Sequence, residues 1–304
     1  MPDPDLIVSN LGFIEGPLRT SDGRLLVTSV SRGLVYEVDL TSRSIIAEIE
    51  TGGGPNGLAE DALGRVWVAQ NGGVTVKSRS PRAVAPGLQL LDGGESDDRL
   101  TTGCRAPNDL AGGPDGRIWF TDPGAPGDGV PGRLCAFDPD TAAVSTLLEG
   151  IDFPNGLAFG LSGDVLYLAE TRTRRVLHFA WDGTGLSPLG VFATLSEGGA
   201  DGLAVDVEGN LLVAVPEADV IVVFAPDGLA LGEVRFACPT FPTNLCFAGD
   251  RRDVLVVTAA KGGRLLAIRP PGAGRGPSHV GSRPARHDDR AESGSQSLIP
   301  LRKK

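Results

Sequence analysis

Short apolar runs separated by turn residues recur along most of the chain. Runs of this kind follow Gly- or Asp-containing turns in "SDGRLLVTSV", "ALGRVWVAQ", "PDGRIWFTD", "LSGDVLYLAE", "VEGNLLVAV" and "DRRDVLVVTA". Turn residues between apolar runs of five or six residues are typical of hairpins that join short strands. No stretch keeps the three-and-four apolar spacing of an amphipathic helix over a dozen residues. The pattern therefore predicts an all-β protein.

A second repeated phrase precedes each of these runs and has an acidic or amide residue at its centre. The copies are "IEGPL", "GPNGLA", "APNDLA", "FPNGLA", "GADGLA" and "FPTNLCF", with Glu15, Asn56, Asn108, Asn155, Asp201 and Asn244 at their centres. Successive copies lie 41 to 52 residues apart, which is typical of propeller blades with four antiparallel strands each. Residues 1–269 are predicted to form one six-bladed β-propeller around a central channel. The segment "DLIVSN" is expected to close the ring by pairing with "GRLLAIR".

The centres of the repeated phrases are expected to converge at one mouth of the channel. The first strand of a propeller blade lines the channel, and each of these residues comes just before such a strand. Asn or Asp before Gly is also a common turn signal, which explains any single copy. Turn formation does not explain the acidic Glu15 and Asp201, since two buried negative charges repel unless a cation lies between them. Carboxylate and amide oxygens suit Ca²⁺, Mg²⁺ or Mn²⁺.

Composition narrows the class of protein further. The chain has 304 residues, 41% of them hydrophobic, and a formal net charge of -10, which disfavours nucleic acid as a partner. No apolar run approaches the ~18 residues that span a bilayer, and the start has no signal-peptide pattern, so a cytoplasmic location without membrane contact is expected. The four cysteines are widely spaced, and we expect them to be reduced and mostly packing residues. Composition leaves the oligomeric state open.

Several common catalytic arrangements are absent from the sequence. Of the three histidines, His279 and His287 lie in the polar C-terminal segment, and His178 is expected to be a strand residue of the fourth blade. A three-histidine zinc site or a Ser-His-Asp triad is therefore hard to assemble. The chain has no G-x-S-x-G elbow, no Walker-type phosphate loop and no G-x-G-x-x-G between a strand and a helix. For an enzyme, a bound metal ion is the best remaining electrophile.

Several phrases in a fixed order resemble one enzyme family. "EGP" near the start, "PND" followed by "DGRIWFTDP", "FPNGLAF" followed by "LYLAE", and "DGLAVDVEGNLLVA" are similar to the senescence-marker protein, gluconolactonase and luciferin-regenerating enzyme family. The resemblance covers residues 8–269. It implies a divalent metal ion in the channel, with Ca²⁺ first and Zn, Mn, Mg or Fe as alternatives.

The resemblance also implies roles for individual residues. Glu15, Asn155 and Asp201 match the metal-binding residues, and Asn108 matches a residue that contacts the substrate in some members and the metal in others. The Arg that grips the substrate in animal lactonases stands two positions before that Asn. Here that position is Ala106, and Arg105 is the nearest candidate.

The family implies hydrolysis, commonly of a sugar lactone in carbohydrate metabolism. Metal-activated water would attack the lactone carbonyl, with Asp201 as the base or as the carboxylate that orients the water. A phosphotriesterase reaction like that of diisopropyl fluorophosphatase on the same site is an alternative, which direct Asn108 coordination would favour. A non-catalytic binding propeller is a further alternative, because fold does not dictate function.

Two glycine-rich segments, 92–104 and 123–132, are expected to overhang the metal as a lid, or else to be ordinary surface loops. Asp122 in "FTDP" is expected either to bond a sugar hydroxyl or to cap a turn. Asn56 and Asn244 are expected to be spectators or to bind water. Residues 270–304 have seven basic and three acidic residues, no apolar period and the composition of a disordered tail.

Overall fold

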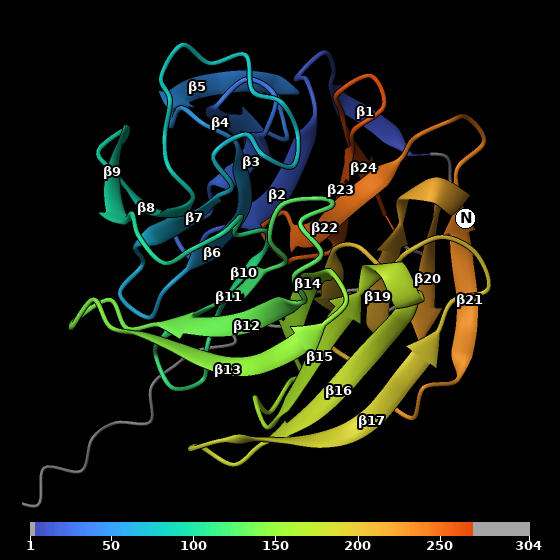
Figure 1. Ribbon diagram of the computed structural model, residues 1–304. Coiled ribbons are helices and arrows are strands. Elements are labelled where there is room, and N and C mark those ends of the chain that lie inside the picture. Colours follow the sequence, from blue (N-terminus) through green and yellow to red (C-terminus); the bar gives the residue numbers. More distant parts are fainter. Residues whose placement is uncertain (1–3, 270–304) are drawn as a thin grey trace, which may run out of the picture.

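The computed structural model describes residues 4–269, which form six four-stranded antiparallel sheets. The sheets follow one another around a centre in sequence order, so the fold is a six-bladed β-propeller (Figure 1). Two 3-10 turns, η1 (Thr171–Thr173) and η2 (Pro216–Ala218), complete the regular structure of the described residues. The fold class predicted from the repeat is confirmed.

Each blade begins with the strand nearest the channel, and the inner strands of neighbouring blades contact one another. Blade 1 comprises β2 (Ile14–Arg19), β3 (Leu25–Ser29), β4 (Leu34–Asp39) and β5 (Ser44–Glu50). Blade 2 comprises β6 (Pro55–Glu60), β7 (Val66–Gln70), β8 (Gly87–Asp92) and β9 (Glu95–Leu100). Blade 3 comprises β10 (Leu110–Gly112), β11 (Ile118–Asp122), β12 (Gly132–Phe137) and β13 (Val144–Ile151). Blade 4 comprises β14 (Pro154–Phe159), β15 (Val165–Glu170), β16 (Arg175–Trp181) and β17 (Leu186–Thr194). Blade 5 comprises β18 (Leu203–Val205), β19 (Leu211–Val215), β20 (Val220–Phe224) and β21 (Ala230–Arg235). Blade 6 comprises β22 (Pro242–Ala248), β23 (Val254–Ala259), β24 (Arg264–Ile268) and β1 (Asp5–Val8).

The sixth blade is completed by the N-terminal strand. β1 pairs antiparallel with β24, with Asp5 opposite Ala267 and Leu6 opposite Leu266. Ile7 is buried in a cluster that also contains Ile14 of blade 1. Closure therefore joins the two ends of the described chain in one sheet, as the sequence predicted, and removes an open sheet edge.

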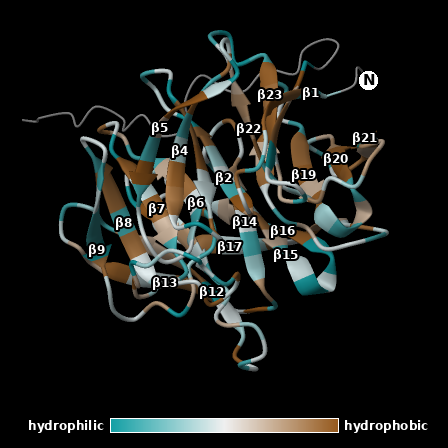
Figure 2. Cartoon of the chain, turned by 90° about the horizontal axis from the view of Figure 1, so that it is seen from above, coloured by the Kyte–Doolittle hydropathy of each residue, from teal (hydrophilic) through white to brown (hydrophobic). Residues whose placement is uncertain are grey.

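The core lies between the blades because successive residues of a strand point to opposite faces of its sheet. In β11, Trp119 packs on blade 4, and its ring centroid lies 4.9 Å from that of Trp181. The next residue, Phe120, packs toward blade 2 in a cluster with Trp67. Both faces of the middle strands are thus covered, which explains why these strands read as nearly continuous apolar runs (Figure 2).

Glycine in the repeated phrase serves close packing of the inner strands. A Cβ atom added to Gly57 would lie 2.6 Å from the Cα of Asp109, one added to Gly156 would lie 2.8 Å from the Cα of Gly202, and one added to Gly202 would lie 2.6 Å from the Cα of Asn244. These three glycines have no positive φ, so the turn explanation of Asn-Gly does not hold for them. Gly is required there because the next blade's backbone occupies the space of a side chain.

We expect Gly156→Ala to lower the free energy of unfolding by roughly 3 kcal/mol, because the added methyl group forces two inner strands apart. Denaturant unfolding measures this loss. Gly185→Ala is the matched control, since a Cβ atom at Gly185 has open space around it and that residue also has no positive φ. Equal stability of the two variants would contradict the packing explanation.

Two further expectations concern the C-terminal segment and membrane-spanning helices. The segment 270–304, predicted to be a disordered basic tail, lies outside the described residues. Between residues 4 and 269, no helix has the length and apolar character needed to cross a bilayer.

Candidate functional site

Glu15, Asn56, Asn108, Asn155, Asp201 and Asn244, which we call the ring residues, lie at the start of the six inner strands. Four of them are in β2, β6, β14 and β22, and the other two come two residues before β10 and β18. Because the inner strands run in the same direction along the channel, the ring residues share one mouth, and we call that side the site face. Five are buried, with 6 to 7% of their surface exposed, and Asp201 is partly exposed.

A β-bulge at the start of the inner strand accompanies the ring residue in four blades. The strand register shifts between Glu15 and Leu18 in β2, between Pro55 and Leu58 in β6, and at the corresponding places in β14 and β22. Bulges re-aim side chains and are common beside active sites. In these four blades the ring residue therefore lies on an irregular stretch of backbone, and the regular strand follows.

Three carboxyl groups interact at this mouth. Burial, followed by the nearby charge of Asp109, raises the pKa of Glu15 to about 8. Burial raises the pKa of Asp109 to about 6. Loss of hydration together with the charges of Glu15 and Asp109 raises the pKa of Asp201 well above its ordinary value. The physical cause is the same in each case, because a low-dielectric site that concentrates negative charge disfavours ionisation. The same field favours a bound cation.

The sequence analysis missed Asp109. In "PNDLA" this residue stands where the copies at Asn56, Asn155 and Asp201 have Gly, and that departure from the repeat is the signal that could have found it. The Asp109 carboxylate accepts hydrogen bonds from Leu110 N–H at 2.9 Å and from Asn244 Nδ2 at 3.1 Å. Blades 3 and 6 lie opposite each other, so the bond to Asn244 spans the channel.

The amide ring residues differ in their side-chain partners. Asn155 hydrogen-bonds the Asp201 carboxyl, which partly offsets the rise in the pKa of Asp201. Asn244 donates to Asp109, so it is part of the carboxylate network. Asn56 Oδ1 is buried and has no hydrogen-bond partner among the described residues. An unpartnered buried acceptor costs about 1–3 kcal/mol, so its place at the mouth calls for an explanation.

Asp122 has hydrogen-bond partners within the protein. It is fully buried, and its carboxylate accepts from Ala106 N–H at 2.8 Å, from Arg105 N–H at 3.1 Å and from Arg133 Nη2 at 2.7 Å. These contacts hold the segment before Asn108 against blade 3. Asp122 therefore anchors this segment, and a bond from it to a sugar hydroxyl stays a prediction.

Arg105 is half-buried, and its guanidinium Nη1 donates to the Pro131 carbonyl at 2.8 Å. The side chain thus reaches the 123–131 loop, which joins β11 to β12 on the site face. The structure ties the position of Arg105 to this loop and to Asp122. A contact with substrate stays a prediction.

The expectation for the segment 92–104 is largely wrong. Gly93 and Gly94 form the turn between β8 and β9, on the side opposite the site face, and Glu95–Leu100 is the outermost strand of blade 2. Only residues 101–104 return to the site face. The glycine-rich composition suggested a loop, but backbone pairing with β8 makes most of this segment a hairpin.

The longest site-face loop is the 71–86 segment, which the sequence analysis did not single out. Its backbone reaches over blade 1, where Arg79 N–H donates to the Ser31 carbonyl at 2.8 Å and Gly53 N–H donates to the Arg82 carbonyl at 2.9 Å. Arg82 Nη1 also donates to Ser96 Oγ at 2.8 Å. The loop is therefore fastened to both blades beside the mouth.

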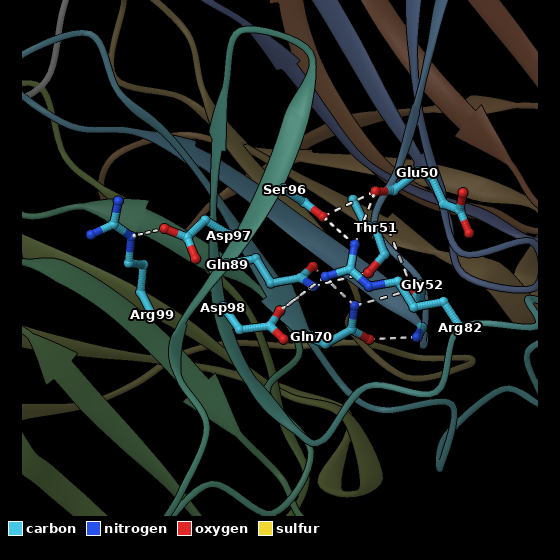
Figure 3. A network of polar contacts seen from close by, with 11 residues as sticks. Glu50, Thr51, Gly52, Gln70, Arg82, Gln89, Ser96, Asp97, Asp98 and Arg99 are labelled. Atoms are coloured by element: carbon cyan, nitrogen blue, oxygen red, sulfur yellow. Dashed lines mark hydrogen bonds and ion pairs between the residues drawn. The ribbon is translucent and has the colours of Figure 1, made fainter.

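Buried amides beneath this loop join blades 1 and 2 (Figure 3). Gln70 Nε2 donates to the Gly52 carbonyl at 3.2 Å and to Gln89 Oε1 at 3.1 Å. Gln89 Nε2 donates to the Thr51 carbonyl at 2.9 Å and to Asp98 Oδ1 at 2.7 Å. Because the amides satisfy backbone groups of the neighbouring blade, they fix the 51–54 connection that leads to Asn56.

The smaller expectations about His and Cys residues are mostly met. His178 lies in β16, half-buried, with its ring centroid 5.6 Å from that of Phe192. All four cysteines are free, but Cys238 is exposed and is not a packing residue. A hydrogen bond from Arg264 lowers the pKa of the Cys238 thiol.

The donor set of the mouth fits a hard divalent cation. Within residues 4–269, no three or more His, Cys, Asp or Glu side chains form a group that could hold a metal ion by themselves. A metal site would therefore need amide oxygens, and the ring supplies them beside Glu15 and Asp201. The mutual repulsion of the carboxyl groups and the unpartnered Asn56 Oδ1 are the two observations that favour a cation there.

Comparison with known proteins identifies the family. Residues 95–261 match the family model described as the SMP-30/Gluconolactonase/LRE-like region, which is more than half of the chain. The chain belongs to this family. The match includes Asn108, Asn155 and Asp201, and Glu15 lies before it.

Relatives of this family member include two named enzymes. A pentonolactonase from Haloferax volcanii is 36% identical over 160 residues, 51% of this chain and 53% of that protein. A diisopropyl-fluorophosphatase from Loligo vulgaris is 31% identical over 182 residues, 53% of this chain and 56% of that protein. The matches thus span about half the length of these relatives.

A solved structure shares the fold over nearly the whole chain. The calcium-binding protein regucalcin from Agrobacterium tumefaciens superposes with a TM-score of 0.75 at 19% identity, covering 91% of this chain and 96% of that one. At this identity the likeness shows the fold alone.

Proposed function

We propose that the protein is a divalent-metal-dependent hydrolase that opens a sugar lactone at the site face of the channel. One observation carries the proposal: the carboxyl groups of Glu15, Asp109 and Asp201, far apart in sequence, come together at one mouth of the channel, where burial and mutual repulsion disfavour their ionisation. The family and the pentonolactonase relative supply the substrate class. A cytoplasmic location and the absence of nucleic-acid or membrane partners stay predictions.

Glu15, Asn155 and Asp201 are the residues that would hold the cation, which we propose to be Ca²⁺. When bound, the cation would polarise the lactone carbonyl and make the attacking water more acidic. Asp201 would orient that water and accept its proton. Its partial exposure leaves it open to the site face, and the Asn155 hydrogen bond fixes the direction of its carboxyl group. A base placed in this way contributes about 10²–10⁴-fold to the rate.

Asn108 would bind the substrate from blade 3. It is buried, and its backbone is held on both sides, because Asn108 N–H donates to the Thr121 carbonyl at 2.9 Å and its carbonyl accepts from Gly57 N–H at 2.7 Å. A fixed backbone orients the amide without a large entropy loss on binding. Arg105, tied to the 123–131 loop, would contact the more distant hydroxyl groups.

A phosphotriesterase activity on the same residues is the second candidate. The diisopropyl-fluorophosphatase relative favours it, since its match is 31% identical and covers 53% of this chain, about as much as the 51% that the pentonolactonase match covers. The two reactions share the need for a polarised oxygen and an attacking water. Substrate assays separate them.

The test is a pH-indicator assay over a panel of aldonolactones, with diisopropyl fluorophosphate as the competing substrate. We expect hydrolysis of at least one lactone well above the uncatalysed rate, its loss with chelator and its return on addition of Ca²⁺ or another divalent ion. Turnover of the fluorophosphate alone would support the second candidate. Binding of lactones without turnover of either substrate would reject both enzymes.

A further inference from the structure

Asn56 has a side-chain environment unlike that of any other buried polar residue described. Its Oδ1 is the one buried side-chain nitrogen or oxygen in residues 4–269 that lacks a hydrogen-bond partner. The residue is 6% exposed and lies at the bulge of β6, on the ring between blades 1 and 3. Buried polar atoms without partners are rare and often mark the place of an ion or ligand.

The Asn56 backbone is rigidly held although its side-chain oxygen is not. Its carbonyl accepts from Thr28 Oγ1 at 2.7 Å, so blade 1 fixes it from one side. The following residue, Gly57, donates its N–H to the Asn108 carbonyl at 2.7 Å, so blade 3 fixes it from the other. A backbone shift that brought a donor to the unpartnered oxygen would therefore break these hydrogen bonds.

A turn-forming role does not account for this Asn. Asx turns use the side-chain oxygen to accept a nearby backbone N–H, as Asp61 Oδ1 does from Leu63 at 2.9 Å in the turn after β6. Asn56 Oδ1 makes no such bond. Two other ring amides do have side-chain partners, since Asn244 donates a hydrogen bond to Asp109 and Asn155 hydrogen-bonds Asp201.

No group among residues 4–269 donates a hydrogen bond to Asn56 Oδ1. The nearest ring neighbour in blade 1 is Glu15, and the Asp109 carboxyl lies against Gly57 from blade 3. Both carboxyl groups act as hydrogen-bond acceptors, Glu15 from Gly16 N–H at 3.2 Å and Asp109 from Leu110 N–H at 2.9 Å. An acceptor placed among acceptors needs a positively charged partner, and a divalent cation at the mouth satisfies all of them together.

We propose that Asn56 Oδ1 is a direct ligand of the divalent cation bound at this mouth, added by blade 2 to the Glu15, Asn155 and Asp201 set. This inference rests on the proposed function for the presence of the cation. It assigns to Asn56 a binding role that the sequence had left as spectator or water-binding, and it makes the cation site extend across four blades.

The test measures metal binding and stability without any lactone. Ca²⁺ is titrated calorimetrically into chelator-treated wild-type protein and into the Asn56→Leu and Asn56→Asp variants. We expect Asn56→Leu to raise the Kd for Ca²⁺ by about 10-fold or more, and Asn56→Asp to retain binding because an oxygen remains. In thermal unfolding without metal, Asn56→Leu should be at least as stable as wild type, because the variant loses an unpartnered polar atom and no hydrogen bond.

Asn210→Leu is the matched control for a partnered buried Asn. Its Nδ2 donates to Asp206 Oδ2 at 2.9 Å in a turn at the opposite side from the site face. We expect that variant to lose stability without metal and to keep the wild-type Kd. Asn56→Leu with the wild-type Kd would overturn the inference, as would lower metal-free stability with an unchanged Kd.

The outcomes also separate this inference from the proposed function. Wild-type protein that binds no divalent ion would overturn both the inference and the metal-dependent reaction. Ca²⁺ binding that depends on Asn56, in a protein that hydrolyses none of the lactones, would reject the reaction and leave the assignment of Asn56 standing.

Discussion

Asp201→Asn is expected to lower kcat/KM for the lactone substrate by roughly 10²- to 10⁴-fold while the propeller stays folded. The substitution keeps the shape of the side chain and removes the carboxylate that we assign to proton transfer and cation binding. Its backbone contacts do not change, since Asp201 N–H still donates to the Ala214 carbonyl at 2.9 Å. Steady-state kinetics, together with Ca²⁺ titration, measures the two effects separately.

Asp227→Asn is the control for this substitution. Asp227 is exposed in the turn before β21, where it accepts from Leu229 N–H at 3.0 Å, and an Asn oxygen can do the same. The control should keep wild-type turnover. An Asp201→Asn protein that retains both metal affinity and full turnover would show that the attacking water is activated elsewhere.

The second large effect concerns the stability of the metal-free protein at different pH values. In the unfolded chain Glu15 ionises near its ordinary pKa of 4.5, whereas in the folded protein its pKa is about 8. Between these values the folded state binds more protons than the unfolded state, so the free energy of unfolding falls as pH rises. The stabilisation is fully present below pH 4.5 and is lost as pH rises through 8. For Glu15 alone it is on the order of 5 kcal/mol.

Chelator-treated protein should accordingly show a lower Tm at pH 8.5 than at pH 5.5. Asp109 and Asp201 act in the same direction, because the pKa of each is raised in the folded protein. Ca²⁺ should restore the Tm most at the higher pH, since the ionised carboxylates bind it.

Glu15→Gln tests the origin of this pH dependence. The neutral amide removes the group with the pKa of about 8, so the fall in Tm between pH 5.5 and 8.5 should become markedly smaller. The variant should also bind Ca²⁺ more weakly. A slope equal to that of wild type would mean that Glu15 does not titrate in the folded protein as its burial among acidic groups implies.

The blades could be predicted because their signal is local and repeated. Each hairpin needs turn residues and a short apolar run, and six copies of the same order leave little choice of architecture. The pairing of β1 with β24 was also predictable, because an otherwise open sheet edge and a short apolar segment are complementary.

Asp109 and Asp122 show where the local signal fails. Both are acidic residues close to the end of a strand. Asp109 differs from most other copies of the repeat, which have Gly at that position, but no local pattern separates Asp122 from a residue that faces the channel. The structure places Asp109 against Asn244 across the channel and Asp122 against Arg133 within blade 3. Partners from other strands decide the role of a carboxylate, because its pKa and its exposure depend on the groups that surround it.

The sequence by itself determined the number of blades, the order of their strands and the position of the six ring residues at the start of the inner strands, but not Asp109. These follow from turn chemistry and from the alternation of side chains along a strand, both of which act over a few residues. Only the tertiary structure decided which ring groups have hydrogen-bond partners and that Asn56 Oδ1 has none. It also decided that the 71–86 loop crosses to blade 1. Hydrogen bonding and burial are properties of groups brought together from different blades, so they appear only when the ring is closed.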